Sequence, residues 1–553
     1  MVAFGAYLNA LGGDLVYDDR FQILRNPTLR DLANLPALFG QSVWQFMSTD
    51  PDKPLGLYYR PLFNAALLLE YQAFNTRTFG WHLVSAALHA LNTVLVYGLG
   101  RTWGYRAAAA GVGAALFAVH PVHVESVAWI SGLPDPLAAA GLLGAAIVYE
   151  RGCRAGSPVG WLAACALLAA ALSSKEVAAA FPLFVLAREW MDPEPGRARR
   201  LWRACRRAAP FAAVVVVHLC LRYAVLGIVT AADVSNRTVT ATQVLLTLPS
   251  VLTTYLRLLI APYPLSAVYD VQFVTDPVAA RILLPLAFVV VVAAASGALV
   301  AIAPITSRAL LWFGIFLWPV LDLRAFNSHE SMVHDRYLYI PSAGFCLLLG
   351  LGIVALWQCG SVWRRVAGAG GLALGGLWLT LTVAQSRVWH DDLTLATHVL
   401  RWQPTSAFFQ NFRGAAFSER GDLAAAEDSY RAALRLRPNY GDAYANLGDV
   451  QLRAGRWSEA AGSYRNALAN GAASAMTYLN LGFATAQLGD VVGAEAAYRA
   501  ALSRQPNQAE ARLRLANLLE RQGREAEAIA LRQGDRAPLT GPLGAPSNAA
   551  PRR

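Results

Sequence analysis

Two adjacent carboxylates, Asp18 and Asp19, follow the first apolar segment of the chain in the run Gly-Asp-Leu-Val-Tyr-Asp-Asp-Arg. A carboxylate at a membrane surface can take the proton from an acceptor hydroxyl, and a second negative charge close by raises the pKa of that base or orients the substrate. The pair is therefore a candidate catalytic base. An Asp-Asp pair in a loop also commonly forms a turn or a helix cap, and this structural interpretation stays open.

Three basic side chains lie at the edges of apolar runs, where an ionisable group is costly unless it is used or paired. Lys175 stands in Ser-Ser-Lys-Glu, Arg60 in Leu-Tyr-Tyr-Arg-Pro-Leu, and Arg336 in Asp-Arg-Tyr-Leu-Tyr. We predict that they bind a lipid phosphate at headgroup depth. Two alternatives stay open: Lys175 forms an ion pair with Glu176 or another neighbour, and Arg336 with Tyr337 merely holds the end of a span.

A loop between two apolar runs carries a denser set of polar side chains, His-Pro-Val-His-Val-Glu-Ser-Val-Ala-Trp-Ile-Ser-Gly-Leu-Pro-Asp. Its HxxH spacing could ligate a metal, but no third ligand stands at the right offset, and the six cysteines show no metal-ligand spacing either. We predict no metal site and leave a divalent cation open as a requirement of the chemistry. Further candidate site residues, without a fixed role, are His120, His123, Glu125, Asp135, Glu176, His334 and Tyr337.

Membrane helices must position these side chains. The chain of 553 residues is 56% hydrophobic and only 15% charged, which is too apolar for an ordinary soluble protein. Because a span needs about 20 apolar residues, the runs between residues 81 and 386, with a shortened first segment at 1–13, predict an all-α membrane bundle of about 11 spans. The run 243–262 contains a proline and an arginine, and we predict that it lies along the membrane surface.

The charges predict the topology. Lysine and arginine outnumber aspartate and glutamate by 47 to 36, and arginine-rich loops favour the cytoplasmic side. With an odd number of spans, the candidate side chains and the C-terminal region are then extracytoplasmic. Basic and aromatic residues do not interleave as in a single-strand binding surface, so we exclude a nucleic-acid partner. The richest loop holds Arg197, Arg199, Arg200, Arg203, Arg206 and Arg207.

The C-terminal part repeats with a period of 34 residues, as in Gly414, Gly448 and Gly482. This period predicts an α-solenoid of tetratricopeptide repeats, three full and one degenerate, with a concave groove. Asn446 and Asn480 could bind a peptide backbone in the groove, unless they serve helix packing. The predicted order is a membrane domain at 1–390, a linker at 391–406, the repeats at 407–535 and a flexible tail at 536–553.

The chain resembles the transmembrane and tetratricopeptide-repeat O-mannosyltransferase family and its bacterial relatives in the segments GDLVYDDR, YYRPL, WHLVSAALHALNTVLVY, LFAVHPVHVESVAWISGLPD, SSKE and DRYLYIPS. The resemblance implies a GT-C glycosyltransferase fold, a polyprenyl-phosphate sugar donor such as a mannosyl lipid, and a lumenal or periplasmic site. It matches Asp18 and Asp19 to the family's catalytic acidic pair. The chain departs from the family at Leu133 and Pro134, where a basic residue is common, at Asp335, where a glutamate is common, and in its short first span.

These observations predict an integral-membrane glycosyltransferase that moves mannose or another hexose from a polyprenyl-phosphate donor to an acceptor hydroxyl, on protein Ser/Thr or on a glycan. The predicted partners are membrane lipid, the lipid-linked sugar and an acceptor that the repeats bind. The predicted location is a bacterial cytoplasmic (inner) membrane with the repeats outside. The alternative is a non-catalytic scaffold whose repeats recruit envelope proteins. A transporter is disfavoured, since an inverted repeat is not evident.

Overall fold

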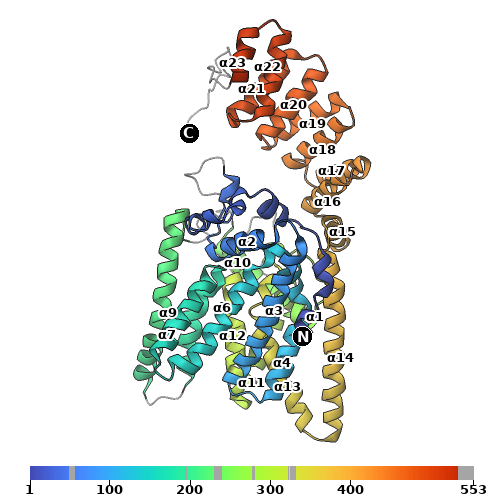
Figure 1. Cartoon of the computed structure of the whole chain (residues 1–553). Helices are drawn as coiled ribbons and strands as arrows, with labels where there is room; N and C mark the ends of the chain where they lie inside the picture. Colours follow the sequence, from blue (N-terminus) through green and yellow to red (C-terminus); the bar gives the residue numbers. More distant parts are fainter. Residues whose placement is uncertain are drawn as a thin grey trace. The chain divides into compact units, whose positions relative to one another are not determined.

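The computed structural model describes residues 1–48, 56–192, 196–229, 239–276, 280–321, 323 and 332–533. Within these ranges every regular element is a helix, which confirms the predicted all-α class. The chain divides into two compact units, Met1–Gln403 and Pro404–Arg553, and each is described by itself (Figure 1). The predicted flexible tail at 536–553 lies outside the described residues.

The first unit is a bundle of helices joined by short 3-10 and π-helical turns. Its first helices are α1 (Val2–Gly5), α2 (Pro61–Phe74), α3 (Thr78–Thr102), α4 (Ala107–Ala118), α5 (Val124–Ala128), α6 (Pro134–Val148), α7 (Pro158–Leu172) and α8 (Phe181–Met191). They are followed by α9 (Arg197–Leu226), α10 (Ala241–Ile260), α11 (Ala280–Ile302), α12 (Ser307–Leu317), α13 (Ser342–Gln358), α14 (Ser361–Ser386) and α15 (Asp392–Trp402).

Seven helices of the described chain are long and apolar enough to cross a membrane, and an eighth span results if α4 and Pro121–Ala128, bent by 52°, cross together. The sequence predicts about 11, because each apolar run is counted as a span. In the structure α7 and α13 are shorter apolar helices, and 1–13 forms only α1 and the turn Leu8–Gly12. α10, predicted to lie along the surface, has the length and composition of a span.

Glycines let the helices of the first unit approach closely. A Cβ on Gly113 of α4 would lie 2.9 Å from the Leu347 Cα of α13, and one on Gly141 of α6 would lie 2.7 Å from the Leu167 carbonyl oxygen of α7. Small residues at helix interfaces are the usual means of close packing inside a membrane. These close contacts fix α4 against α13 and α6 against α7.

An ion-pair network, called here the arginine network, joins the C-terminal end of α6 to α8 and the first turns of α9. The buried Arg188 contacts Glu150 at 2.7 Å and Asp192 at 2.6 Å, and Arg207 contacts Glu189 at 3.3 Å. Each acid binds more than one arginine, so the network cross-links three helices. Its members are Glu150, Arg154, Arg188, Glu189, Asp192, Arg203 and Arg207.

The second unit is the predicted array of helical pairs. The pairs are α16 (Ala407–Glu419) with α17 (Leu423–Leu436), α18 (Gly441–Arg453) with α19 (Trp457–Ala469), α20 (Ala475–Gln487) with α21 (Val491–Arg504), and α22 (Ala509–Arg521) with α23 (Glu525–Gln533). A Cβ on Gly448 would lie 2.8 Å from the Tyr464 ring, and Gly414 and Gly482 face Tyr430 and Tyr498 in the same way. This close contact explains the repeating glycines.

The region predicted as a linker, 391–406, contains α15, which belongs to the first unit. The Asp391 side chain accepts a hydrogen bond from Thr394 N at 3.0 Å and caps the helix. Leu395 and Val399 are buried on one side of α15. A capped, amphipathic helix therefore forms in the region that was predicted as a linker because its long apolar runs end there.

Candidate functional site

The two adjacent carboxylates have different surroundings. Asp19 is fully buried, and its carboxylate accepts hydrogen bonds from Ser131 N at 2.8 Å, Ser131 Oγ at 2.5 Å and Val16 N at 3.1 Å. Burial raises the pKa of Asp19 to about 7, although these hydrogen bonds oppose the rise. Asp19 thus ties the loop to the segment before α6, and its acceptor atoms are occupied.

Asp18 is only partly buried, and its carboxylate has no hydrogen-bond partner among the described residues. Burial raises the pKa of Asp18 to about 6, and the positive charge of Arg336 counteracts part of that rise. A free carboxylate with a pKa near neutrality is suited to accept a proton. The two adjacent acids therefore differ: the Asp19 carboxylate is fixed by hydrogen bonds, and the Asp18 carboxylate has none among the described residues and can accept a proton.

The loop that carries Asp18 is held by residues at the far end of the first unit. Tyr17 N donates to Asp392 Oδ1 at 2.8 Å, and Arg20 Nε contacts Asp392 Oδ2 at 2.9 Å. Tyr17 has a φ of +60°, a left-handed conformation that a tyrosine adopts only when its surroundings impose it. Trp129 donates from Nε1 to the Val16 carbonyl at 3.2 Å. These contacts fix the backbone on both sides of Asp18 and so orient its side chain.

Lys175 is buried and contacts Asp135, with 2.5 Å between Nζ and Oδ1. Its ammonium group also lies 5.0 Å from the centre of the Tyr337 ring. Burial lowers the pKa of Lys175, and the Asp135 carboxylate counteracts that shift. The sequence left open whether Lys175 pairs with Glu176 or with another neighbouring acid. In the structure its partner is Asp135.

Arg336 lies in the turn Asp335–Leu338 and pairs with the buried Glu125. Its backbone N donates to Glu125 Oε2 at 2.9 Å, and its guanidinium binds the other carboxylate oxygen. The guanidinium lies 5.6 Å from the Trp129 ring centre and 5.2 Å from that of Tyr337. His334 Nδ1 is 3.9 Å from the same Glu125. Arg336 thus has one acid and two aromatic faces around it.

Arg60 completes this group of charges. It contacts Glu176 at 2.8 Å and lies 4.4 Å from the Tyr58 ring centre. Arg222 of α9 reaches Glu176 from the other side at 3.3 Å. Burial would raise the pKa of Glu176, but Arg60 and Arg222 hold it below its ordinary value. We call the following residues the site cluster: Lys175, Asp135, Arg336, Glu125, Arg60, Glu176 and Arg222.

The two histidines of the HxxH motif face different partners. His120 Nε2 is 3.1 Å from the Leu259 carbonyl oxygen, and its Nδ1 accepts a hydrogen bond from Val122 N at 3.3 Å. His123 Nε2 is 2.8 Å from Ser342 Oγ. In the described part of the chain, no group of three or more His, Cys, Asp or Glu side chains is placed to hold a metal ion. Both imidazoles join loops and helices here.

Three residues with defined roles in this region were not among the predicted site residues. Ser131 holds Asp19, Asp392 holds the loop around Tyr17, and Arg222 binds Glu176. Arg222 carried a signal in the sequence, because an arginine within an apolar run normally has a specific partner. Ser131 and Asp392 carried none, since a serine in a turn and an acid after a span are ordinary residues in those places.

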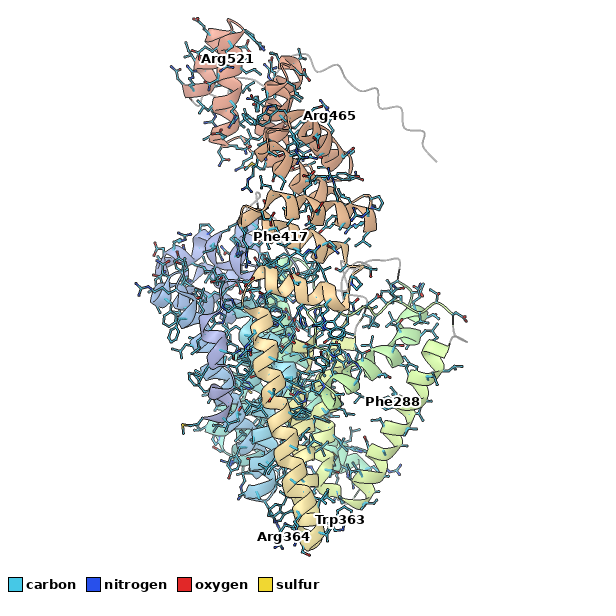
Figure 2. The ribbon with its side chains drawn as sticks, turned by 90° about the vertical axis from the view of Figure 1, so that its right-hand side faces the viewer. Phe288, Trp363, Arg364, Phe417, Arg465 and Arg521 are labelled. Carbon is cyan, nitrogen blue, oxygen red and sulfur yellow. The ribbon has the colours of Figure 1, made fainter. Side chains whose placement is uncertain are left out.

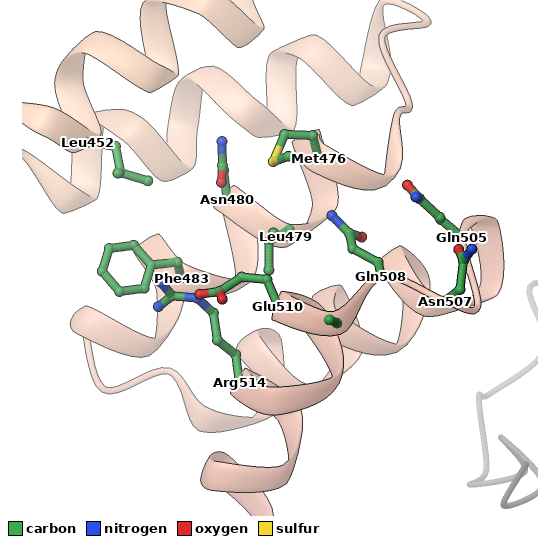
Figure 3. A pocket seen from close by; sticks show the side chains of 11 residues that line it. Leu452, Met476, Leu479, Asn480, Phe483, Gln505, Asn507, Gln508, Glu510 and Arg514 are labelled. Atoms are coloured by element: carbon green, nitrogen blue, oxygen red, sulfur yellow. The ribbon is translucent and has the colours of Figure 1, made fainter. Parts of the chain in front are cut away.

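The repeat array has a concave cavity of about 640 Å³ that both predicted asparagines line. A neighbouring cavity of about 570 Å³ shares Met476 and Asn480 with it and continues past Leu479 and Phe483 (Figure 3). Asn446 Nδ2 donates to Asn411 at 3.0 Å, and Asn480 Nδ2 donates to Asp449 at 2.9 Å. The asparagines thus pair with neighbouring first helices and also face the groove, so both interpretations keep support.

Comparison with known proteins relates both units to one group. Family models described as TPR repeat and tetratricopeptide repeat match residues 414–455, 443–474 and 479–538. The Caenorhabditis elegans protein O-mannosyl-transferase F38B6.6 is 26% identical over 450 residues, which are 78% of this chain and 61% of that protein. The chain is homologous to protein O-mannosyl-transferases. Human protein O-mannosyl-transferase TMTC1 is 27% identical over 80% of this chain and 55% of its own length.

The chain thus spans about three fifths and about half of the length of these two relatives. Over a shorter stretch, the Drosophila melanogaster protein O-mannosyl-transferase Tmtc2 is 36% identical, covering 32% of this chain and 19% of that protein. Among solved structures, MamA 41-end from Desulfovibrio magneticus RS-1 is similar with a TM-score of 0.25 and 19% identity, over 31% of this chain and 86% of that one. A score this low says nothing about what the chain does.

Proposed function

We propose that the chain is an integral-membrane glycosyltransferase that moves a hexose, mannose in the first instance, from a polyprenyl-phosphate donor to a serine or threonine hydroxyl of a protein. The observation that carries the proposal is the open carboxylate of Asp18 beside the charge of Arg336. The names of the homologues support the reaction class. Their greater length leaves the acceptor a proposal for this chain.

In this proposal Asp18 takes the proton of the acceptor hydroxyl while the hydroxyl oxygen bonds to C1 of the sugar. The bond between C1 and the phosphate oxygen breaks, and polyprenyl phosphate leaves with the electron pair. Lys175, Arg336 and Arg60 bind the phosphate and stabilise its growing negative charge. Asp19 keeps the loop in place through Ser131. The donor carries its own leaving group, so a nucleotide is not needed.

The proposed site lies on the extracytoplasmic side of a cytoplasmic membrane, and the repeats face the same compartment and present the acceptor. The support is the run of six arginines in the first turns of α9, with Arg364 and Arg365 at the start of α14, since both lie at helix ends remote from the site cluster. A reporter fused after Gln533 tests this orientation. Cytoplasmic exposure of that reporter would contradict it.

The test of the function uses the full chain in proteoliposomes with polyprenyl-phosphate mannose and serine- and threonine-containing peptides. The Asp18→Asn variant should lower transfer by about a thousandfold, the loss expected for a general base. The matched control is Asp14→Asn, which removes an exposed carboxylate from the same loop. Transfer by Asp18→Asn at the wild-type rate would sink the assignment. A chain that neither binds the donor nor transfers sugar would favour the scaffold.

A further inference from the structure

The first turns of α9 carry arginines on two faces. Arg203 and Arg207 point to the protein, where both bind Glu189, at 3.4 and 3.3 Å. Arg199 and Arg206 are exposed and, among the described residues, have no acidic partner. Arg203 and Arg207 are four apart and lie together on the inward side. Arg199 and Arg206 are seven apart, which is about two helical turns, so they lie together on the neighbouring, outward side. The helix therefore uses some of its arginines for structure and leaves others outside.

An exposed tryptophan shares the outward face. Trp202 is 64% exposed, and the Arg206 guanidinium lies 4.9 Å from the centre of its ring. A soluble surface rarely needs so large an exposed aromatic side chain, whereas tryptophan is enriched where a membrane protein meets the headgroups. We call Arg199, Trp202 and Arg206 the α9 corner.

The start of α14 repeats this combination. Trp363, Arg364 and Arg365 are all exposed, and Trp363 retains 51% of its accessible surface. Figure 2 labels Trp363 and Arg364 at this end of α14. None of the three has an ion-pair partner among the described residues. We call these residues the α14 corner. Two separate helices thus present arginine with tryptophan at one end of the first unit.

Both corners lie one membrane thickness away from the proposed sugar-transfer site. Arg199 is ~35 Å along the α9 axis from Arg222 of the site cluster, at 1.5 Å per residue. Arg364 is ~33 Å along α14 from Ser386, which precedes the Trp389 that stacks on Trp129. The hydrocarbon core of a bilayer is about 30 Å thick. If the site cluster meets one headgroup layer, the corners meet the other.

We propose that the α9 and α14 corners form a binding surface for anionic phospholipid headgroups, distinct from the site for the sugar donor. A guanidinium binds phosphate through paired hydrogen bonds, and tryptophan holds the depth of the helix at the headgroups. The preference is for lipids with net negative charge, because a zwitterionic headgroup carries a cation that opposes the arginines. The surface does not depend on the proposed transfer reaction.

The experiment measures lipid retention by the purified, detergent-solubilised full chain with native mass spectrometry, using phosphatidylglycerol and phosphatidylcholine as probes. The wild-type chain should retain phosphatidylglycerol in preference. Each arginine near an anionic surface contributes about fivefold to affinity, so Arg199→Gln with Arg206→Gln should weaken it by about 25-fold. Arg199→Lys with Arg206→Lys keeps the charge and should retain most of the preference. Added salt should weaken the wild-type preference.

The matched control removes two exposed arginines from the repeat array, Arg465→Gln with Arg521→Gln, and should leave lipid retention unchanged (Figure 2). The α14 corner is tested by Arg364→Gln with Arg365→Gln. Equal thermal unfolding of all variants shows that they fold. A wild-type chain without preference for phosphatidylglycerol would overturn the proposal. Wild-type retention by the variant lacking all four corner arginines would overturn it as well.

Discussion

The arginine network and the site cluster stand at opposite ends of α6, ~22 Å apart between Asp135 and Glu150. Each combines four cations with three anions, yet they are built differently. In the network every acid serves at least two arginines. In the site cluster only Glu176 is shared, by Arg60 and Arg222, whereas Asp135 binds Lys175 alone. Three of its four cations lie against the rings of Tyr58, Trp129 and Tyr337.

The difference separates a structural role from a binding role. Acids shared between arginines of several helices leave those arginines little capacity for another ligand. A cation that has one acid and an aromatic face keeps donors available, and a phosphate can add to the pair without breaking a framework. The number of charges is the same in both regions and does not show which of them could bind a ligand. The pattern of ion-pair partners does distinguish them.

The largest effect is expected in the arginine network. Arg188→Leu removes the buried cation that joins Glu150 to Asp192 and leaves both acids with Arg154 alone, which costs about 3–5 kcal/mol of unfolding free energy. Arg151→Gln is the control, because Arg151 is exposed beside the network and hydrogen-bonds only to Thr102 among the described partners. Thermal unfolding in detergent measures both. A small effect of Arg188→Leu would remove the structural role of the network.

In the site cluster, replacing both members of a pair should spare stability and abolish binding. Lys175→Met with Asp135→Leu removes a buried pair together, so the unfolding free energy should change by less than about 1 kcal/mol. Binding of polyprenyl-phosphate mannose should fall on the order of a hundredfold, because the phosphate loses a buried charged donor. Titration of the purified chain with the lipid gives the affinity. Undiminished binding would remove Lys175 from the phosphate site.

Asp392 should affect turnover without affecting donor binding. Asp392→Ala removes the acceptor of Tyr17 N and the partner of Arg20, so the Asp18 loop shifts. Displacing a catalytic group by about 1 Å can cost on the order of a hundredfold in rate. Asp391→Ala, which loses the cap of α15, is the adjacent control. The experiment compares transfer rates at saturating donor. Equal losses in both variants would assign the effect to α15 as a whole.

The pH dependence should report Asp18. Because its pKa is raised to about 6, the carboxylate is ionised above that pH and protonated below it. A base works only when ionised, so transfer should fall about tenfold for each pH unit below 6. Arg336→Gln removes the charge that lowers this pKa and should move the midpoint upward. The rate is followed at saturating donor across this range. A flat profile would exclude Asp18 as the base.

The repeats and the membrane body differ in how much the sequence revealed. The Gly448 and Tyr464 positions recur every 34 residues, because in each pair of helices the glycine makes room for the tyrosine ring of the second helix. The number of spans was not predictable in this way, since apolar runs such as those of α4 and α7 end or bend before they reach the length of a span.

The sequence singled out every residue of the site cluster except Arg222, but it did not predict how these residues pair. The sequence singled out Asp18, Lys175 and Arg336 from charge near apolar runs. Their partners are distant along the chain: Asp19 binds Ser131 across 112 positions and Glu125 binds Arg336 across 211. Nothing local marks Ser131 as a partner, so the different states of Asp18 and Asp19 required the folded structure.

The contact between Tyr17 and Asp392 joins residues 375 positions apart. During synthesis, the loop that carries Asp18 emerges early and waits for nearly the whole first unit before its partner exists. The proposed active centre is therefore completed late, once the segment before the repeats has been made. A nascent chain stopped before α15 should insert its helices and lack a positioned base.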